Sequence, residues 1–327
     1  MNTEFDFAAF EDDISFRHLL QKAREISWEN FGKHITFYLP GMIRYGNETG
    51  LYPAISITGK DCQLKCDHCN GKVLEPMISA TTPESLIEIC KKFHEKGYIG
   101  CLLSGGSDLK GEVPWERFID AIGEIKRRTN LSISIHTGII DFKTAKKLKH
   151  VGIDQALIDV IGDDKTMREV YHLNDGVSLI YNSLKALRAA EIPIVPHIVV
   201  GINYGKIKGE LKAIEIICEF KPRSLVIVVV TPFKDTPMQS IIPPRPKEIA
   251  TIIALARLRM PDVTISLGCE RGRGKDGFET EIYAIDAGVN RIAIQSDRAI
   301  ERAREYGLQI NFQKTCCSLN SECSRNL

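Results

Sequence analysis

Short apolar runs rich in β-branched residues recur along the chain at regular spacing, and a charged amphipathic segment follows each run. This alternation is typical of parallel β/α units, in which a buried strand is followed by a helix that packs back onto the sheet. Eight such units predict an α/β fold of the closed (β/α)8 barrel type. The predicted strands are residues 54–58, 100–104, 131–136, 155–160, 194–200, 225–230, 264–268 and 291–295.

The segments between these runs carry helical patterns. One helix is expected to begin at Pro83, because proline suits the first helical turn, and to end near Gly97. The others predicted are residues 143–150, 179–191, 210–220, 247–260 and 297–306.

The barrel does not account for the whole sequence. A helical pattern at residues 7–31 and an irregular stretch at 35–42 precede it. We therefore divide the chain into an N-terminal helical extension (1–50), a barrel (51–307) and a C-terminal tail with several cysteines (308–327). Reactive groups in such barrels lie at the C-terminal ends of the strands, so the functional residues are expected there.

Composition narrows the class of protein. The chain has 327 residues, of which 43% are hydrophobic and 26% charged, and this suits one large globular domain. A net charge of +1 gives no electrostatic sign of a nucleic acid or membrane partner. No signal core or stretch of ~18 apolar residues is seen, so we expect a cytoplasmic protein. Ten cysteines are unusual there unless they bind metal.

Three cysteines follow the first predicted strand with the spacing Cys62-x3-Cys66-x2-Cys69. Three thiolates on one short loop can hold three irons of a [4Fe–4S] cluster and leave the fourth iron open to another ligand. A zinc site and a disulfide are the alternatives. Zinc normally takes four ligands, often as two separated pairs, and His68 could hardly reach the same metal as its neighbour Cys69.

The cysteine spacing, the preceding strand and residues 61–70 resemble the radical S-adenosylmethionine (SAM) superfamily. The resemblance implies that the amino acid end of SAM chelates the open iron, and that SAM is cleaved reductively to a 5′-deoxyadenosyl radical that removes hydrogen from an unactivated carbon. It also implies that His68, at a position usually aromatic in the family, packs against the SAM adenine.

Glycines close the second predicted strand in the sequence Ser104-Gly105-Gly106. Alone they would indicate only a tight turn, although glycines let a backbone approach a ligand. The resemblance implies that this turn contacts the amino group of SAM.

Polar groups end the next strands. His136 ends the third strand and Asp159 the fourth, and we count both as cofactor-binding candidates. Asp159 could accept hydrogen bonds from the ribose of SAM, or form a structural salt bridge or helix cap. Val199 and Gly201, on the fifth strand, resemble the family's apolar-glycine element beside adenine. No protein side chain is assigned as the catalytic group.

A second group of cysteines, Cys316, Cys317 and Cys323, follows the eighth unit, and Cys269 ends the seventh strand beside two arginines. A tail that returns to the strand ends could join these thiolates around a second iron–sulfur cluster, completed by Cys323 or by Arg271. The alternative is a disordered tail with incidental thiols. Three further cysteines are assigned to core packing, namely Cys90, Cys101 and Cys218.

Within the superfamily, residues 35–325 resemble biotin synthase and its relatives, in which a second cluster is sacrificed as the source of sulfur. The tail and residues 267–271 are not the ligand pattern of that enzyme. Together with residues 38–42 and 69–77, they look more like a component of the two-protein lipoyl synthase found mainly in archaea and some bacteria.

This resemblance implies sulfur insertion into an octanoyl chain carried on a lysine of a lipoyl-bearing protein. It also implies a second radical SAM component as partner and an electron donor such as ferredoxin. The alternatives are a biotin synthase-like or other cofactor-biosynthesis radical SAM enzyme without sulfur donation, and an iron–sulfur carrier or inactive partner subunit.

Overall fold

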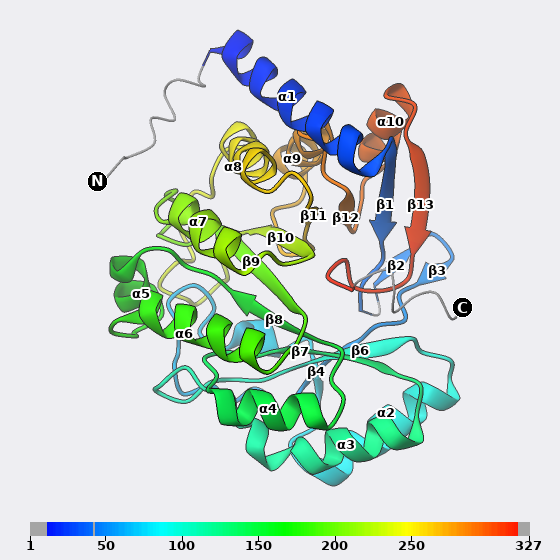
Figure 1. Ribbon diagram of the computed structural model, residues 1–327, viewed down its shortest axis with the longest axis vertical. Coiled ribbons are helices and arrows are strands. Elements are labelled where there is room, and N and C mark those ends of the chain that lie inside the picture. Colours follow the sequence, from blue (N-terminus) through cyan, green and yellow to red (C-terminus); the bar gives the residue numbers. More distant parts are fainter. Residues whose placement is uncertain (1–11, 42, 320–327) are drawn as a thin grey trace.

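The structure is a computed structural model that describes residues 12–41 and 43–319. Its centre is one sheet of eleven strands, in the order β13-β1-β12-β11-β10-β9-β8-β7-β6-β4-β5, and every neighbouring pair is parallel (Figure 1). All eight predicted strands are confirmed in order. They are β4 (Ala54–Ser56), β6 (Gly100–Ser104), β7 (Ser132–His136), β8 (Gln155–Asp159), β9 (Ile194–Val200), β10 (Ser224–Val229), β11 (Thr264–Leu267) and β12 (Arg291–Ala293).

The sheet curls but does not close as an eight-stranded barrel. Among the described residues β4 pairs with β5 (Ile78–Ser79) and β6, whereas β12 pairs with β11 and β1 (His34–Tyr38). β13 (Gln309–Gln313) adds beyond β1. The sequence analysis treated 35–42 as irregular, but Ile35 and Phe37 alternate into the core and give β1 a buried face.

Loops span the opening between the two sheet edges. The Leu51 N–H, just before β4, donates to the carbonyl of Lys314, just after β13 (2.7 Å), whereas the bond from the Leu39 N–H to the Gln313 carbonyl (2.8 Å) extends the β1–β13 pairing. The short hairpin β2 (Arg44–Tyr45) and β3 (Glu48–Thr49) lies in the same connection. These bonds enclose a lumen without a continuous ladder of strands.

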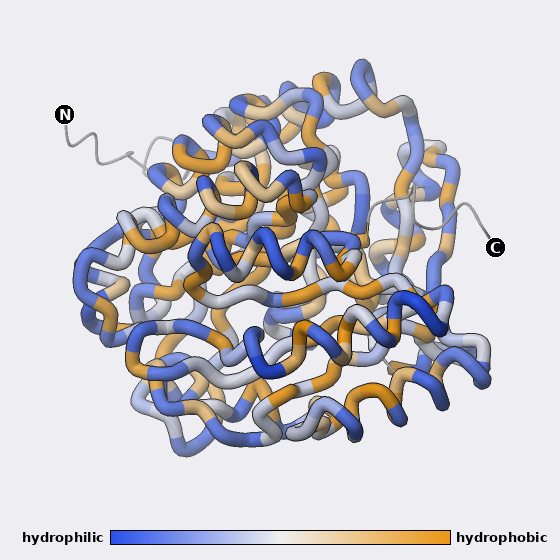
Figure 2. The backbone as a smooth tube through the Cα atoms, turned by 60° about the horizontal axis from the view of Figure 1, so that its bottom comes forward, coloured by the Kyte–Doolittle hydropathy of each residue, from blue (hydrophilic) through white to orange (hydrophobic). Residues whose placement is uncertain are grey.

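Helices cover the outer face of the sheet. Thr82 caps α2 through the Ser85 N–H, and Pro83 stands in its first turn as predicted. In Figure 2 many helices alternate between hydrophilic and hydrophobic colours along their turns. The helices are α1 (Asp13–Phe31), α2 (Pro83–Glu95), α3 (Ile119–Arg128), α4 (Phe142–His150), α5 (Asp164–Val170), α6 (Gly176–Ala189), α7 (Glu210–Phe220), α8 (Pro246–Arg259), α9 (Lys275–Asp286) and α10 (Asp297–Glu305), with 3-10 turns η2 (Lys72–Leu74) and η3 (Trp115–Arg117).

The N-terminal helix α1 lies outside the β/α units. It packs across α8 and α9, as Figure 1 shows, with Leu20 and Ala23 buried beneath it. Asp12 caps its start by accepting from the Ile14 and Ser15 N–H groups, each at 2.9 Å. Within the described residues, no helix combines the length and the apolar character needed to cross a membrane.

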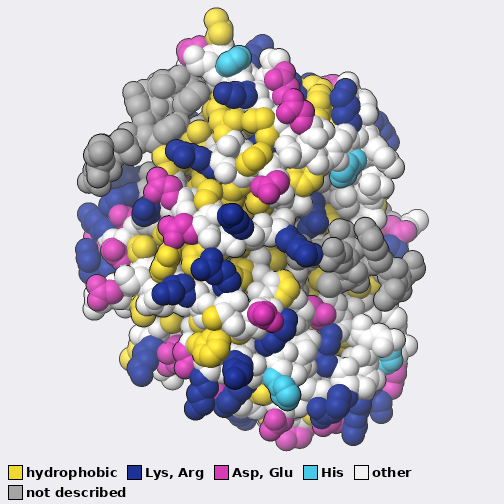
Figure 3. Space-filling view, viewed as in Figure 1, with side chains coloured by type: hydrophobic (Ala, Val, Ile, Leu, Met, Phe, Trp, Pro, Cys, Tyr) yellow, Lys and Arg dark blue, Asp and Glu magenta, His cyan; other side chains and the backbone are white. Residues whose placement is uncertain are grey.

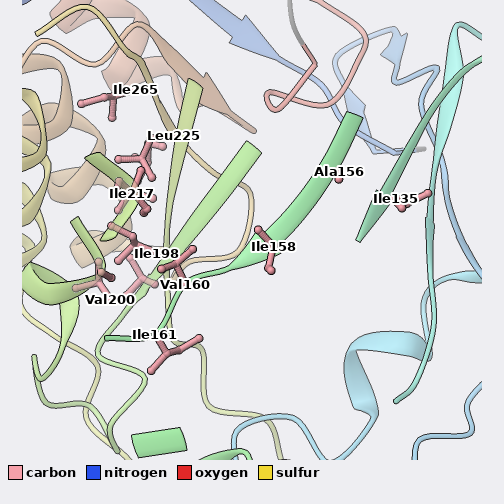
Figure 4. Close-up of a cluster of buried hydrophobic side chains, with 14 of the residues drawn as sticks. Ile135, Ala156, Ile158, Val160, Ile161, Ile198, Val200, Ile217, Leu225 and Ile265 are labelled. Atoms are coloured by element: carbon pink, nitrogen blue, oxygen red, sulfur yellow. The ribbon is translucent and has the colours of Figure 1, made fainter. Parts of the chain in front are cut away.

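The core has two layers, one on each face of the sheet. Outward-facing side chains such as Ile198 and Leu225 pack beside Ile217 of α7 (Figure 4). A smaller cluster occupies the inner face and combines strand residues with one residue of the tail: Tyr38, Leu157, Val195, Val226, Val228, Ala293 and Cys317. On the outer surface, charges of both signs are interspersed over the face drawn in Figure 3.

The tail folds into the lumen after β13. Cys317 is 3% exposed, and the Arg291 guanidinium donates to the carbonyls of Cys317 and Leu319 (both 3.1 Å). Gln155 donates to the Ser318 carbonyl (3.1 Å). Residues 315–319 of the tail are therefore packed inside the protein, although Gln309, Asn311 and Lys314 before them are exposed. The alternative of a disordered tail is thus removed for Cys316 and Cys317. Cys323 lies outside the described residues.

Candidate functional site

The Cys62–Cys69 loop borders a pocket of about 820 Å³ at the carboxyl edge of the sheet, a volume that includes the part open to solvent. The pocket brings together most of the predicted first-site residues: Cys62, Cys66, Cys69, His68, Gly105, Gly106, His136 and Asp159. Ser104, Val199 and Gly201 are not part of its lining. Gly201 has a φ of +81° and packs against Pro244, so the local turn accounts for this glycine.

The cysteine loop is fastened to the turn after β6. The Gly106 N–H donates to the Thr58 hydroxyl (2.7 Å), and the Gln63 N–H donates to the Ser107 carbonyl (2.8 Å). A Cβ at Gly106 would lie 1.9 Å from the carbonyl oxygen of Asp61. Gly106 is therefore required by the cysteine loop itself, and its N–H is already engaged within the protein.

Two of the three thiols, Cys66 and Cys69, lie in an environment that opposes their ionisation without a counter-charge. Desolvation is the main cause, and the neighbouring cysteines contribute to it. Together these effects raise the pKa of Cys66 far above its usual value and that of Cys69 to about 11. An iron–sulfur cluster supplies positive charge to thiolate ligands, so this donor set fits such a group. Within the described residues, no three His, Cys, Asp or Glu side chains converge closely enough to hold a single metal ion.

His68 and Tyr171 form an aromatic wall of the pocket, with ring centroids 5.1 Å apart. Desolvation lowers the pKa of His68 to about 4, so the ring is neutral near pH 7. The His68 Nδ1 and Tyr171 hydroxyl are buried and have no hydrogen-bond partner. Such atoms normally have a partner, and a bound molecule with polar edges would provide it. Tyr171 was missed from the sequence because it follows the short helix α5 with no motif around it.

His136 and Asp159 form an ion pair in the same pocket, with Nε2 and Oδ1 3.4 Å apart. Burial alone would raise the pKa of Asp159, but His136 and more distant histidines lower it to about 2. Burial lowers the pKa of His136, but the charge of Asp159 and its hydrogen bond raise that pKa by more. The net effect is a raised pKa. The structure thus shows the salt bridge considered for Asp159, and the carboxylate still lines the pocket. Its contact with ribose remains a prediction.

His197, which the sequence analysis did not select, lies beside this pair. Its ring centroid is 5.9 Å from that of His136, and its Nδ1 is 3.1 Å from the Val195 carbonyl oxygen. Desolvation lowers its pKa to about 4, so the ring is neutral. The carbonyl partner places the proton on Nδ1 and leaves Nε2 as an acceptor. Only its alternation with Val195 and Val199 along β9 could have indicated that it faces the lumen.

The second group of cysteines gathers in the lumen. Cys316 is half-buried and Cys317 is buried. The Cys317 thiol and the Ser318 hydroxyl, 3.0 Å from the sulfur, lower the pKa of Cys316. Cys269 retains exposed surface, and the surrounding protein, with the nearby Cys316 thiol as a further cause, raises its pKa to about 11. The structure therefore brings Cys269 close to the tail thiols.

Arg271 is not available as a ligand. Its buried guanidinium forms an ion pair with Glu281 and donates to the carbonyls of Ala293 (2.8 Å) and Ile294 (3.1 Å). Arg291 is the arginine that contacts the tail, through backbone carbonyls.

The remaining cysteines are structural, as predicted. Cys90 and Cys101 are completely buried, and Cys218 is partly buried against the main core. The nine described cysteines form no disulfide.

Two protein-family models match the chain. The model of the radical SAM superfamily matches residues 56–215, and that of the biotin and thiamin synthesis associated domain matches residues 226–318. The first therefore spans the cysteine loop and the pocket, and the second spans Cys269 and the tail thiols.

Curated relatives and solved structures agree with these matches. Biotin synthase of Leptospira biflexa is 25% identical over 247 residues, covering 72% of this chain and 67% of that protein. Biotin synthase of Clostridioides difficile is 25% identical over 263 residues, covering 78% of each. Methylornithine synthase (PylB) superposes with a TM-score of 0.65 at 17% identity, covering 92% of this chain and 90% of that one. The hydrogenase maturase HydG from Carboxydothermus hydrogenoformans gives 0.66 at 15% identity, covering 97% and 75%. At these identities, the structural likeness shows the fold alone.

Proposed function

The chain belongs to the radical SAM superfamily and is biotin synthase-like, and from this premise we propose that it inserts sulfur into an unactivated C–H bond of an acyl chain. The observation that carries the proposal is the position of the tail. Cys316 and Cys317 lie inside the lumen beside Cys269, separate from the cysteine loop of the pocket. Two separate groups of thiols suit one cluster for SAM and a second as sulfur donor.

In the first site, Cys62, Cys66 and Cys69 would hold the [4Fe–4S] cluster. When bound, the cluster and SAM supply the 5′-deoxyadenosyl radical. The protein provides the surroundings. The packing of Gly106 on the loop fixes the cysteines, while the unpartnered His68 Nδ1 offers a hydrogen bond to SAM.

The other pocket residues control charge and water. The His136–Asp159 pair places a carboxylate in the pocket beside an imidazole whose pKa that carboxylate raises, and the carboxylate can accept from ribose hydroxyls. Apolar inner-face residues such as Val195 and Val226 exclude water from the lumen, which protects a reactive carbon radical. Cys269, Cys316 and Cys317 would hold the second cluster, and Cys323 is a further candidate.

For the substrate we propose an octanoyl chain on a lysine of a lipoyl-bearing protein. A second radical SAM lipoyl synthase component and an electron donor such as ferredoxin would be the partners. The sequence supports this proposal, because the cysteines of the tail and residues 267–271 are not the ligand pattern of biotin synthase. The curated relatives favour biotin synthase activity as a second candidate, since both of those compared above carry that name.

The test is the iron and sulfide content after anaerobic reconstitution. Two cubane clusters predict about eight irons per chain, and a Cys316→Ala/Cys317→Ala variant should retain about four. A Cys218→Ala variant is the matched control and should keep the parental content. About four irons in all three proteins would refute a second cubane as sulfur donor.

Sulfur insertion itself is tested by mass spectrometry of an octanoyl-lysine peptide and of the biotin precursor after anaerobic turnover. A gain of sulfur on the peptide alone supports lipoyl synthesis, and a gain on the biotin precursor alone supports the second candidate. Failure of the protein to cleave SAM would indicate an iron–sulfur carrier or an inactive subunit.

A further inference from the structure

Ile294, the residue that follows β12, has an unusual backbone conformation. Its φ is +55°, in the left-handed region, where a β-branched residue is an outlier. The clash between Cβ and the backbone costs roughly 1–2 kcal/mol there. Such a conformation persists only where the surrounding structure fixes it, and it is often found at functional sites.

Two segments of the chain, the end of β1 and the loop after β11, fix this conformation. The Ile294 carbonyl accepts from Arg271 (3.1 Å) and from Arg273 (3.3 Å), and the Ile294 N–H donates to the Tyr38 carbonyl (2.9 Å). Arg271 is held in turn by its buried ion pair with Glu281. The two arginines follow Cys269 in the loop after β11, so the same loop carries a proposed cluster ligand and sets the Ile294 turn.

The left-handed turn changes where the Ile294 side chain points. Ala293 faces the lumen as part of the inner-face cluster, and in an extended strand the next side chain would face the helices. Ile294 nevertheless packs against that same inner-face cluster. Two consecutive side chains therefore face the lumen, and the second does so because of the strained turn.

Two residues on other parts of the sheet share these properties of Ile294. Leu102 of β6 and Val199 of β9 also pack against the inner-face cluster, and like Ile294 they remain partly exposed. Partly exposed side chains on the inner face show that the lumen is not filled beside them. Cys316, also half-buried, contributes a thiol to this region. The three aliphatic side chains and the Cys316 thiol are thus each partly accessible.

We propose that Ile294, Leu102 and Val199 form an apolar wall that receives the alkyl chain of the substrate, and that Ile294 determines how long a chain fits beside Cys316. The proposal rests on the proposed function in so far as the substrate carries an unbranched acyl chain. It accounts for the cost of the strained turn, because an extended backbone at this position would turn the side chain away from the lumen.

The experiment measures chain-length preference in the reconstituted protein. Binding of N-methyl hexanamide, octanamide and decanamide is followed by calorimetry for the parent and the Ile294→Gly variant. Glycine adopts a positive φ without strain, so the turn is kept while the side chain is lost. We expect the decanamide-to-octanamide affinity ratio to rise about 10-fold in the variant, the least that one methylene is worth in an apolar pocket. Ile294→Asn, which also tolerates this backbone, is the second variant if the glycine variant unfolds.

Lys221→Gly is the matched control. Lys221 ends α7 with a φ of +47° on the exposed surface, so this substitution relieves similar strain away from the lumen. It should leave the chain-length preference unchanged. The proposal is overturned if both Ile294→Gly and Ile294→Asn keep the decanamide-to-octanamide affinity ratio of the parent. It is also overturned if the parent binds none of the three amides.

The two proposals fail in different ways. If the amide preference shifts as expected but no sulfur is inserted into an octanoyl-lysine peptide, the wall stands and the proposed function falls. If the peptide gains sulfur and the amide preference does not shift, the proposed function stands and the apolar wall is refuted.

Discussion

Gly106→Ala is the substitution whose effect follows most directly from the geometry. The added Cβ would lie 1.9 Å from the Asp61 carbonyl oxygen and 2.6 Å from the Cys62 Cα. Both are backbone atoms, so no side-chain rotation relieves the overlap. The turn after β6 and the cysteine loop must separate, which breaks the bond from the Gly106 N–H to Thr58 (2.7 Å).

The magnitude can be bounded from overpacking in other proteins. Forcing an extra methyl group into a packed region costs typically about 1–3 kcal/mol. For domains of about 150–250 residues, each kcal/mol of destabilisation lowers the Tm by roughly 2–4 °C. The substitution should therefore lower the Tm by roughly 2–12 °C. The effect on the cluster should be larger than the effect on the fold, because the displaced residue is next to Cys62 and three thiols must meet one cluster.

The assay combines thermal unfolding of the metal-free protein with iron content after reconstitution. Gly106→Ala should lose the [4Fe–4S] cluster of the loop. Gly272→Ala is the matched control, since nothing lies within 4 Å of its added Cβ. Gly105→Ala should be intermediate, since its nearest contact is Ile57 at 3.0 Å. Parental iron content and Tm in Gly106→Ala would refute the packing argument.

Three further substitutions test other parts of the structure. Asp159→Asn removes the charge that raises the pKa of His136, so the pKa of His136 should fall below 6.5 in an NMR titration. In the parent protein, the Asp159 carboxylate should stabilise the fold fully above pH 3.8. This stabilisation should be lost as the pH falls towards 2, the pKa of Asp159 in the folded protein. Arg271→Met leaves a buried carboxylate without its partner and should lower the free energy of unfolding in urea by about 3–5 kcal/mol; a change under about 1 kcal/mol would contradict it. Arg291→Met removes two charge-assisted bonds to the tail and should speed alkylation of Cys317 in the metal-free protein at least about 10-fold by mass spectrometry, while an unchanged rate would show that other contacts hold the tail.

The strands could be predicted because local pattern decides them. Each of the eight is a short, largely buried run, and its length and apolar character are visible in the sequence. β1 was missed because its five residues run directly into Leu39-Pro40-Gly41, which indicates a turn, and gain their pairing from β12 and β13, far along the chain. The open sheet is likewise a property of long-range pairing, which local pattern does not encode.

The site divides in the same way. The cysteine spacing identified the first site because all three ligands lie on one loop. Tyr171 could not be predicted as a wall of the pocket, since its contact with His68 depends on how α5 packs. The role of Gly106 was interpreted through a ligand, whereas the structure shows contact with Asp61 and Cys62. The strained turn at Ile294 has no counterpart in sequence pattern, because it is imposed by hydrogen bonds from another loop.

The insertion of β1 between β12 and β13 sets an order for folding. His34 pairs with Gln309 and Thr36 with Arg291, so this strand cannot form its ladders until residues 291–313 are present. Contacts so distant in sequence form late and slowly. The supports of the cysteine loop, β4 and β6, lie close together in the chain and can assemble early. Iron–sulfur delivery to Cys62, Cys66 and Cys69 can therefore precede enclosure of the lumen, whereas the tail thiols reach their places only with the final strands.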